Sequence, residues 1–379
     1  MAARTVVLWL AGDVMTGRGV DQILPSPSEP TLHERYVRDA RRYVDLAESA
    51  NGPIPKPVDV SWPWGDALEV IDQARPHVRV INVETSVTGS DDFDLTKGIN
   101  YRMSPRNIGC LSAARPDACV LANNHVLDFG VSGLAETLDS LAGAGLRPVG
   151  AGRTAEQAWR PLGIDAEGHR VLVWAVATES SGVPPSWAAR DDRPGVAFLP
   201  DVSDASCAAV TEHVARAKRP GDLAIVSVHW GSNWGYDVPD SHVRFAHRLV
   251  DGGVDIVHGH SSHHPRPIET YRDRLVLYGC GDLVDDYEGI TGYEQYRDDL
   301  RLLYFVEVDA HTQALQAVRM VPMQARQMRL HHASAADTDW LRRVLDGMSR
   351  DFGSRVGLAP DGALTLGLDR RTSTTGSRS

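Results

Sequence analysis

Short apolar, β-branched runs alternate along the chain with segments whose apolar residues recur at helical spacing. This alternation is typical of βαβ units and of a largely parallel sheet covered on both faces. The expected strands are residues 5–11, 78–83, 118–122, 171–177, 223–229, 255–258, 274–278 and 302–308. The expected helices are residues 64–74, 133–144, 204–217, 242–251 and 338–352.

The later strands depart from this alternation. Residues 267–271 and 274–278 are separated only by Arg272 and Asp273, a gap typical of a hairpin. We therefore expect an α/β fold with mixed rather than purely parallel sheets.

Other segments show no periodicity. Residues 25–30 and 51–62 are rich in proline and are expected to be loops. We expect one main domain over residues 1–325 and a helical extension, packed on it, over residues 326–368. Residues 369–379 are polar and low in complexity, which predicts a disordered tail.

The composition narrows the class of protein. The hydrophobic fraction of 42% and the charged fraction of 23% are ordinary for a soluble globular chain of 379 residues. The net charge of -11 and the absence of a basic patch argue against a nucleic-acid partner. Four cysteines without C-x-x-C spacing favour a reducing compartment, so we expect a cytoplasmic protein.

The N-terminal apolar stretch ends in Asp13 without a small-residue cleavage site, and we interpret it as the first strand rather than a signal peptide. The chain has no apolar run of 18 residues, so no membrane span is expected.

Candidate chemistry is most concentrated just after the apolar run that ends near Val257. Four histidines lie within seven residues there, namely His258, His260, His263 and His264. Histidine is the commonest metal-binding side chain, and a strand end is a usual place for such a site. The alternative is a histidine-rich loop with only adventitious affinity for metals.

Four further polar motifs also follow expected strands. Asp13, after Gly12, could bind a metal, and Arg18 could hold a phosphate or carboxylate, although Gly-Asp is also common in plain turns. Glu84 follows an apolar strand, where a buried carboxylate is tolerated only with a partner, and that partner could be a metal or an arginine. His229 closes another strand and could equally be a core histidine.

The most specific motif is Asn123-Asn124-His125-Val126-Leu127-Asp128. Asn124 offers a carbonyl oxygen to a metal, and His125 offers an imidazole to a substrate, with Asp128 placed to orient its ring. An asparagine turn before the next helix would explain the two asparagines but would leave His125 without a role.

One sheet could bring all these strand ends to one edge. Six mixed oxygen and nitrogen ligands suit two divalent ions of Mn, Fe or Zn. Two such ions, about 3.5–4 Å from each other, can hold the attacking and the leaving oxygen of a displacement reaction. The expected ligands are Asp13, Glu84, Asn124, His229, His260 and His263. The expected substrate-binding residues are Arg18, Asn123, Trp230 and His264. Cys280 lies between glycines with no evident base, and we interpret it as structural.

The order G-D-V-M-x-G-R, N-x-E, A-N-N-H-x-x-D-x-G, H-W-G and G-H-x-x-H resembles the CapA family, over Leu8 to about Asp286. These bacterial proteins are linked to capsule and poly-γ-glutamate synthesis within the calcineurin-like metallophosphoesterase superfamily. The resemblance implies a four-layer α/β/β/α sandwich of the metallophosphoesterase type, with a dinuclear metal centre at the strand ends. It also implies that Asn124 is a ligand and that His125 protonates the leaving group or binds the oxyanion.

The chain departs from these patterns at several positions. Calcineurin-like enzymes usually begin Asp-x-His, whereas Val14 and Met15 follow Asp13, and Glu84 stands in place of the usual bridging aspartate. Family members often carry H-P-H where this chain has Ser261-Ser262-His263, and Gly-Asn where it has Gly281-Asp282.

Three functions remain open at this point, and the weakest of them is a capsule-type amide-forming or transpeptidase role through Cys280. The first is a metal-dependent hydrolase of a phosphoester or a γ-glutamyl-type amide, using metal-activated water, with His125 as general acid, Asp128 as its partner and Arg18 as an anion anchor. The second is a non-catalytic accessory protein that binds poly-γ-glutamate or a related anionic polymer. Trp62 and Trp64, in the proline-rich loop, would make a rim for an organic ligand.

Overall fold

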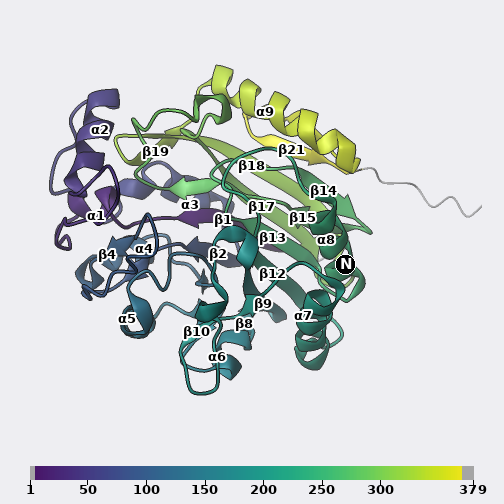
Figure 1. The fold of residues 1–379 in the computed structure, drawn as a ribbon. Coiled ribbons are helices and arrows are strands. Elements are labelled where there is room, and N and C mark those ends of the chain that lie inside the picture. Colours follow the sequence, from purple (N-terminus) through teal and green to yellow (C-terminus); the bar gives the residue numbers. More distant parts are fainter. Residues whose placement is uncertain (1–4, 369–379) are drawn as a thin grey trace, which may run out of the picture.

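Two large β-sheets lie face to face at the centre of the molecule, with helices outside them (Figure 1). The computed structural model describes residues 5–368. The first sheet has the strand order β20-β21-β18-β17-β1-β2-β5-β6, with β16 beside β1 and β19 beside β18. Because β1 is parallel to β2 and β16 and antiparallel to β17, this sheet is mixed, as expected.

The strands of the first sheet come from both ends of the described chain. They are β1 (Thr5–Val14), β2 (Val78–Val83), β5 (Ala118–Val120), β6 (Pro148–Val149), β16 (Asp282–Val284), β17 (Leu300–Asp309), β18 (Leu315–Arg326), β19 (Arg329–His332), β20 (Arg355–Leu358) and β21 (Leu364–Gly367).

The second sheet has the order β11-β9-β12-β13-β15-β14, with β8 beside β9. Its strands are β8 (Leu162–Ala166), β9 (His169–Thr178), β11 (Phe198–Leu199), β12 (Leu223–His229), β13 (Ile256–His260), β14 (Ile268–Tyr271) and β15 (Arg274–Leu277). The expected hairpin is confirmed, since β14 and β15 are antiparallel neighbours. Two short pairs complete the strands, β3 (Ser86–Val87) with β4 (Arg102–Met103) and β7 (Ala151–Gly152) with β10 (Gly195–Val196).

Alternate side chains of β9 show how the layers pack. Val171 and Val173 face the first sheet and belong to the larger apolar core. Leu172 and Trp174 point the other way, into a second core with α7 (Asp204–Ala217). Alternation of this kind follows from the two-residue repeat of a strand.

The helices form the two outer layers. The second core includes α8 (Asp240–Asp251) beside α7, so both helices cover the outer face of the second sheet (Figure 1). Apolar residues of other helices join the larger core, among them α3 (Ala67–Ala74), α4 (Gly109–Ser112) and α5 (Gly130–Gly143). The four-layer α/β/β/α arrangement is therefore confirmed.

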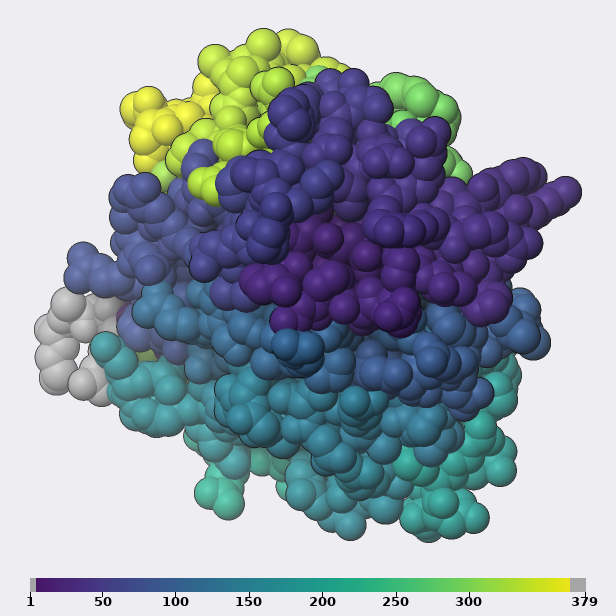
Figure 2. Space-filling view, turned by 90° about the vertical axis from the view of Figure 1, so that its left-hand side faces the viewer, coloured from purple at the N-terminus to yellow at the C-terminus, as the bar shows by residue number. Residues whose placement is uncertain are grey.

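The remaining helices lie around this sandwich. They are α1 (Gly19–Ile23), α2 (Arg41–Asn51), α6 (Ala155–Trp159), α9 (Ala335–Ser349) and the 3-10 turns Trp62–Trp64, Pro105–Asn107, Glu179–Ser181, Pro185–Trp187, Glu294–Tyr296 and Arg350–Phe352. Figure 2 shows a face on which the first half of the chain, purple to blue, lies below the yellow-green C-terminal segment and above the teal middle segment.

The C-terminal segment differs from the expectation. Residues 326–368 contain α9, but they also contain β19, β20 and β21, which extend the first sheet through β18. The physical reason is that Val356, Leu364 and Leu366 are buried against that sheet edge. The tail expected at 369–379 lies outside the described residues. Within residues 5–368, no helix combines the length and apolar character needed to cross a bilayer.

Candidate metal centre

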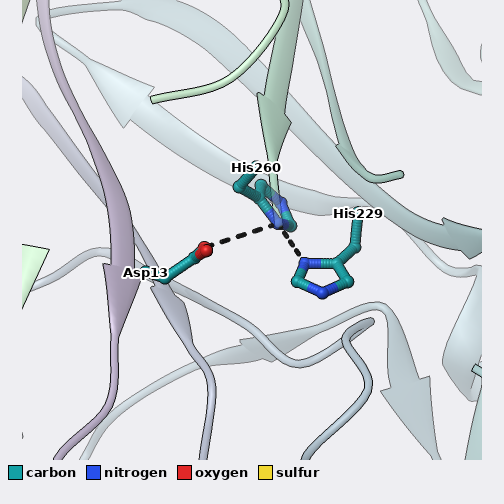
Figure 3. Close-up of side chains that lie close together, drawn as sticks. All are labelled: Asp13, His229 and His260. Carbon is teal, nitrogen blue, oxygen red and sulfur yellow. Dashed lines mark hydrogen bonds and ion pairs between the residues drawn. The ribbon is translucent and has the colours of Figure 1, made fainter. Parts of the chain in front are cut away.

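The carboxyl ends of strands from both sheets meet at one buried place. Asp13 lies on β1, and Glu84 comes directly after β2; His229 and His260 end β12 and β13, where the strand register places them opposite each other. All four side chains are almost fully buried. Figure 3 shows Asp13, His229 and His260 pointing toward one another.

Two glycines allow the strands to approach this closely. A Cβ at Gly12 would lie 1.7 Å from the carbonyl oxygen of Gly281, beside the Asp13 position. A Cβ at Gly259 would lie 2.5 Å from the carbonyl oxygen of Leu277. Any larger residue at either position would push apart the strands that carry the site.

Asp13, His229 and His260 form the first group of candidate metal ligands, with ligand atoms within 4.8 Å of one another. His260 Nδ1 lies 2.7 Å from His229 Nδ1 and 3.8 Å from Asp13 Oδ1. Two imidazoles and a carboxylate are a donor set that suits Zn, Fe or Mn.

A chain of hydrogen bonds behind His260 assigns its tautomer. His258 Nε2 donates to the carbonyl oxygen of Ala11 at 2.9 Å, because a carbonyl can only accept. His258 Nδ1 therefore accepts from Ser227 Oγ at 3.1 Å, and Ser227 Oγ in turn accepts from His260 Nε2 at 2.7 Å. This leaves the lone pair of His260 Nδ1 pointing toward Asp13 and His229, as a metal ligand requires.

Asp13, His263 and Asp282 form the second group, again within 4.8 Å. His263 Nδ1 lies 3.0 Å from Asp282 Oδ1, and Asn233 Nδ2 lies 3.0 Å from His263 Nε2. Asp282 Oδ2 is buried and has no hydrogen-bond partner among the described residues. A buried carboxylate oxygen without a partner is costly, and a cation would satisfy it. The residues present therefore fit two ions that share Asp13.

The electrostatics of the two groups favour bound cations. Burial, with the nearby Asp282 carboxylate, raises the pKa of Asp13 to about 7. Burial also raises the pKa of Asp282 to about 7, although the guanidinium of Arg301 opposes the change. Burial lowers the pKa of His229 and His260 far below the usual range, so both rings are neutral and able to coordinate.

The other expected ligands border the first group. His229 Nε2 lies 3.1 Å from Asn124 Oδ1 and 3.8 Å from Glu84 Oε1. Asn82 Nδ2 donates to Asp13 Oδ1 at 2.7 Å and to Glu84 Oε2 at 3.1 Å, which holds the two carboxylates side by side. Burial and the charge of Asp13 raise the pKa of Glu84 well above its usual value. All six expected ligands thus lie in one connected cluster.

His125 and Asp128 form a pair beside this cluster. His125 Nδ1 lies 2.6 Å from Asp128 Oδ2, while His125 Nε2 lies 3.9 Å from Glu84 Oε1. Lys97 donates to Asp128 Oδ1 and to the carbonyl oxygen of Asn124, and the backbone N–H of Tyr101 donates to Asp128 Oδ2 at 2.7 Å. Asp128 is therefore fixed in place and directs Nε2 of His125 toward the cluster.

Arg18 is not free to hold an anion. Its guanidinium donates to Asp286 at 2.5 and 3.1 Å, to Glu34 at 2.8 Å and to the hydroxyl of Tyr43 at 3.0 Å, and the residue is only 3% exposed. The two carboxylates neutralise its charge. Its position is at the edge of the site, but its interactions are those of a structural ion pair.

The other expected substrate-binding residues are also engaged. Asn123 donates to Asn82 and to the carbonyl oxygen of Val83, and it accepts from the backbone N–H of His125. Trp230 points into the outer core, stacks on His242 and donates to the carbonyl oxygen of Tyr278. His264 is buried, with Nε2 accepting from the N–H of Gly235 and Nδ1 donating to the carbonyl oxygen of Pro265.

The proline-rich loop also differs from the expected rim. Trp62 donates to the carbonyl oxygen of Gln327, and Trp64 is fully buried and donates to that of Cys110. Cys280 is buried, and burial raises the pKa of its thiol well above the usual value, in keeping with a structural role.

Three residues of the site were missed by the sequence reasoning. Asp282 stands at a Gly-Asp turn and was noted only as a departure from the family pattern. Asn82 precedes Glu84 by two residues, and this spacing, which places both side chains on one face of a strand, is a signal that could have found it. Lys97 belongs to a loop without periodicity, and nothing in the sequence pairs it with Asp128.

Comparisons with known proteins place the chain in a family. Residues 7–287 match the family described as the bacterial capsule synthesis protein PGA_cap. The chain belongs to this family. The match covers every residue of the candidate ligand cluster and confirms the resemblance to CapA proteins.

Individual relatives fall within the same group. The chain is 54% identical to a probable polyglutamine synthesis accessory protein of Mycobacterium tuberculosis, over 95% of this chain and 96% of the relative. It is 28% identical to the PGA biosynthesis protein CapA of Bacillus subtilis, over 60% of this chain and 57% of that protein. A solved structure described as a novel phosphatase from Mycoplasma pneumoniae aligns over 85% of this chain and 94% of that chain, with 12% identity and a TM-score of 0.45.

Proposed function

We propose that this PGA_cap family member is a metal-dependent hydrolase that binds two divalent ions, of Mn, Fe or Zn, and acts on a phosphoester or a γ-glutamyl-type amide. The observation that carries the proposal is the pair of ligand groups sharing Asp13, next to the His125–Asp128 pair. When bound, such ions act as Lewis acids and lower the pKa of a coordinated water.

The protein's own residues would then position and protonate the substrate. Asp128 accepts a hydrogen bond from the Nδ1–H of His125, which leaves Nε2 facing the cluster. In its protonated form the ring can then give its Nε2 proton to the leaving oxygen or nitrogen and return to the neutral form. Burial lowers the pKa of His125 to about 4, against the opposing effect of Asp128. An anionic substrate beside the ring favours its protonated form, so proton delivery depends on the bound substrate's charge.

A second candidate function is a non-catalytic accessory protein for an anionic polymer such as poly-γ-glutamate. The observation that favours it is the name of the Mycobacterium tuberculosis relative, which describes an accessory protein. The absence of a histidine after Asp13, where Val14 and Met15 stand, is consistent with it. The intact His125–Asp128 pair favours the hydrolase, because a binding protein does not need a positioned acid.

The deciding experiment measures metal content and turnover on the same samples. Untagged protein is stripped with chelator and reloaded with Mn²⁺, and metal is counted by inductively coupled plasma mass spectrometry. An aryl phosphate and a γ-glutamyl anilide are then assayed with the wild type, His125→Ala and the control His332→Ala, an exposed histidine at the end of β19.

We expect two ions per chain and metal-dependent turnover of one substrate class. His125→Ala should lower that turnover by about 10²–10⁴-fold at unchanged metal content, whereas His332→Ala should leave it intact. Ligand binding without turnover of either substrate would support the accessory function instead.

A further inference from the structure

A cavity of about 790 Å³ opens beside the candidate metal centre, and His263 forms part of its wall. His263 Nδ1 faces Asp282 of the second ligand group, while Nε2 faces Asn233 and, at 3.4 Å, the hydroxyl of Tyr287. Asn233 and Tyr287 also line the cavity. The imidazole ring of His263 is therefore in contact with the cavity on one side and with the second ligand group on the other.

Aromatic rings form the wall next to His263. Trp234 stacks on Tyr293 with ring centroids 3.9 Å apart and planes 7° from parallel. The Trp234 ring is 5.2 Å from the His263 ring, and the Tyr287 ring is 4.9 Å from it on another side. A flat apolar group that enters the cavity would contact aromatic rings that pack directly against His263, a member of the second ligand group.

Several of the residues that line the cavity are large, apolar and exposed. Tyr36 is 85% exposed, Ile99 is 40% exposed and Tyr293 is 37% exposed, and all three line the cavity. Among the described residues, only two other large hydrophobic side chains reach comparable exposure, Leu95 and Leu358. Exposed apolar residues that cluster at a concave site mark a binding surface, because a ligand that covers them removes them from water.

The charges around the cavity do not suit an extended polyanion. Arg18 lines it, but Asp286 and Glu34 already neutralise that guanidinium. The carboxylates of Glu34 and Asp298 also line the cavity, and Arg35 is its remaining cation among the described lining residues. A chain of γ-linked glutamates would meet about as much negative as positive charge here.

We propose that this cavity binds a planar apolar group, such as an aromatic ring, on the part of the substrate that does not react. The inference rests on the proposed function, since it places the reacting group at the ligand cluster and the apolar group against Trp234, Tyr293 and Tyr36. It specifies the substrate as a small ester or amide with an aromatic or comparable apolar moiety.

The test compares two probes that differ only in this moiety and that do not turn over. Dissociation constants of phenylphosphonate and methylphosphonate are measured by isothermal titration calorimetry with the Mn²⁺-loaded full chain. The variants are Trp234→Ala and, as a second change at an exposed position, Tyr293→Ala. Tyr271→Ala is the matched control, because Tyr271 stacks on His247 at β14 and does not line the cavity.

Phenylphosphonate should bind the wild type and the Tyr271→Ala control at least about tenfold more tightly than methylphosphonate, as expected for covering one ring. Trp234→Ala and Tyr293→Ala should each reduce this ratio at least about threefold while leaving methylphosphonate binding unchanged. A ratio near one in the wild type, failure of both probes to bind, or an equal loss of both probes in Trp234→Ala would overturn the inference. So would a γ-glutamate pentamer that binds more tightly than phenylphosphonate and is insensitive to Trp234→Ala.

The outcome is separable from that of the proposed function. If aryl phosphate and γ-glutamyl anilide are not hydrolysed but phenylphosphonate keeps its advantage, the hydrolase proposal fails and the apolar binding site stands. If hydrolysis is observed but methyl and phenyl probes bind equally, the reverse holds.

Discussion

Replacing Asp13 by asparagine should make the metal-free protein more stable at pH 8 and should abolish its response to metal. Asp13 belongs to both candidate ligand groups, so a single substitution removes one ligand from each proposed metal site. Asparagine keeps the size of the side chain and can still accept the hydrogen bond from Asn82 that Asp13 Oδ1 accepts at 2.7 Å. It removes only the charge and one acceptor oxygen.

The magnitude follows from the raised pKa of Asp13. Its carboxyl has a usual pKa of 3.8 and a pKa of about 7 in the folded, metal-free protein, because of burial and the neighbouring Asp282. The folded state therefore holds a proton that the unfolded state has lost, and stability falls as pH rises from about 4 through 7. One pKa unit corresponds to about 1.4 kcal/mol, so at pH 8 the ionised carboxylate costs about 4 kcal/mol.

Asparagine removes this cost but introduces a smaller one. The backbone N–H of Ser261 donates to Asp13 Oδ2 at 3.2 Å, and an amide NH₂ there would face it as a second donor. A lost buried hydrogen bond costs about 1–3 kcal/mol. In chelator, Asp13→Asn should thus exceed the wild type by about 1–3 kcal/mol at pH 8 and fall below it at pH 5, where the wild-type carboxyl is already protonated.

Urea unfolding followed by fluorescence at both pH values, with chelator or with Mn²⁺, checks this reasoning. Mn²⁺ at about 100 times its dissociation constant should stabilise the wild type by about 2.7 kcal/mol per site and the variant hardly at all. Asp21→Asn is the matched control: burial raises the pKa of Asp21 too, but Asp21 bonds to Ser28, Ser104 and Asn107 outside both groups. A variant that is less stable than the wild type in chelator at pH 8, or that keeps the wild-type Mn²⁺ response, would refute the argument.

Three further predictions concern other parts of the structure. His260→Ala and Asp282→Asn each remove a ligand from only one group, so metal analysis should show one ion per chain instead of two; two ions in both variants would contradict the shared-Asp13 arrangement. Lys97→Met should destabilise the protein by about 1–3 kcal/mol in urea unfolding, because buried Asp128 loses its charged donor, and an unchanged midpoint would count against this role. Asp346 accepts from Arg350, Arg355 and the N–H of Val356, which hold its pKa below the usual range. Asp346→Ala should therefore cost about 1–3 kcal/mol at pH 7 and less at pH 3, since the contribution is lost as pH falls below about 4; an equal cost at both would disprove it.

The interior strands and helices could be predicted from the sequence because their patterns are strong. The apolar run at 223–229 and the helical pattern at 204–217 coincide with β12 and α7. The strand β18 was not expected from the sequence because polar residues such as Arg319 and Gln324 interrupt its apolar positions, so it forms no apolar run. Its pairing with β17 on one side and β21 on the other decides its structure, and that information lies elsewhere in the chain.

The sequence could predict which candidate ligands come together, but not the contacts around them. Strand-end position identified Asp13, His229 and His260, since the ends of neighbouring strands meet at one edge. It failed for Arg18, whose partner Asp286 lies 268 residues away and whose charge is neutralised only in the folded chain. The same type of residue at a strand end can bind a ligand or form a buried ion pair, and only its tertiary contacts distinguish the two.

The shared use of Asp13 follows from the registers of the two sheets. In the first sheet, β1 lies between β2 and β16, and the parallel pairing places Asp13 beside Asn82 on one side and Asp282 on the other. In the second sheet, β12 and β13 pair so that His229 lies beside His260. Because the sheets face each other, the carboxylate of β1 meets a histidine pair from the opposite sheet and an aspartate from its own. The two candidate ligand groups on either side of Asp13 are therefore a consequence of strand order, and a register shift of one residue in β1 would turn the side chain away from both.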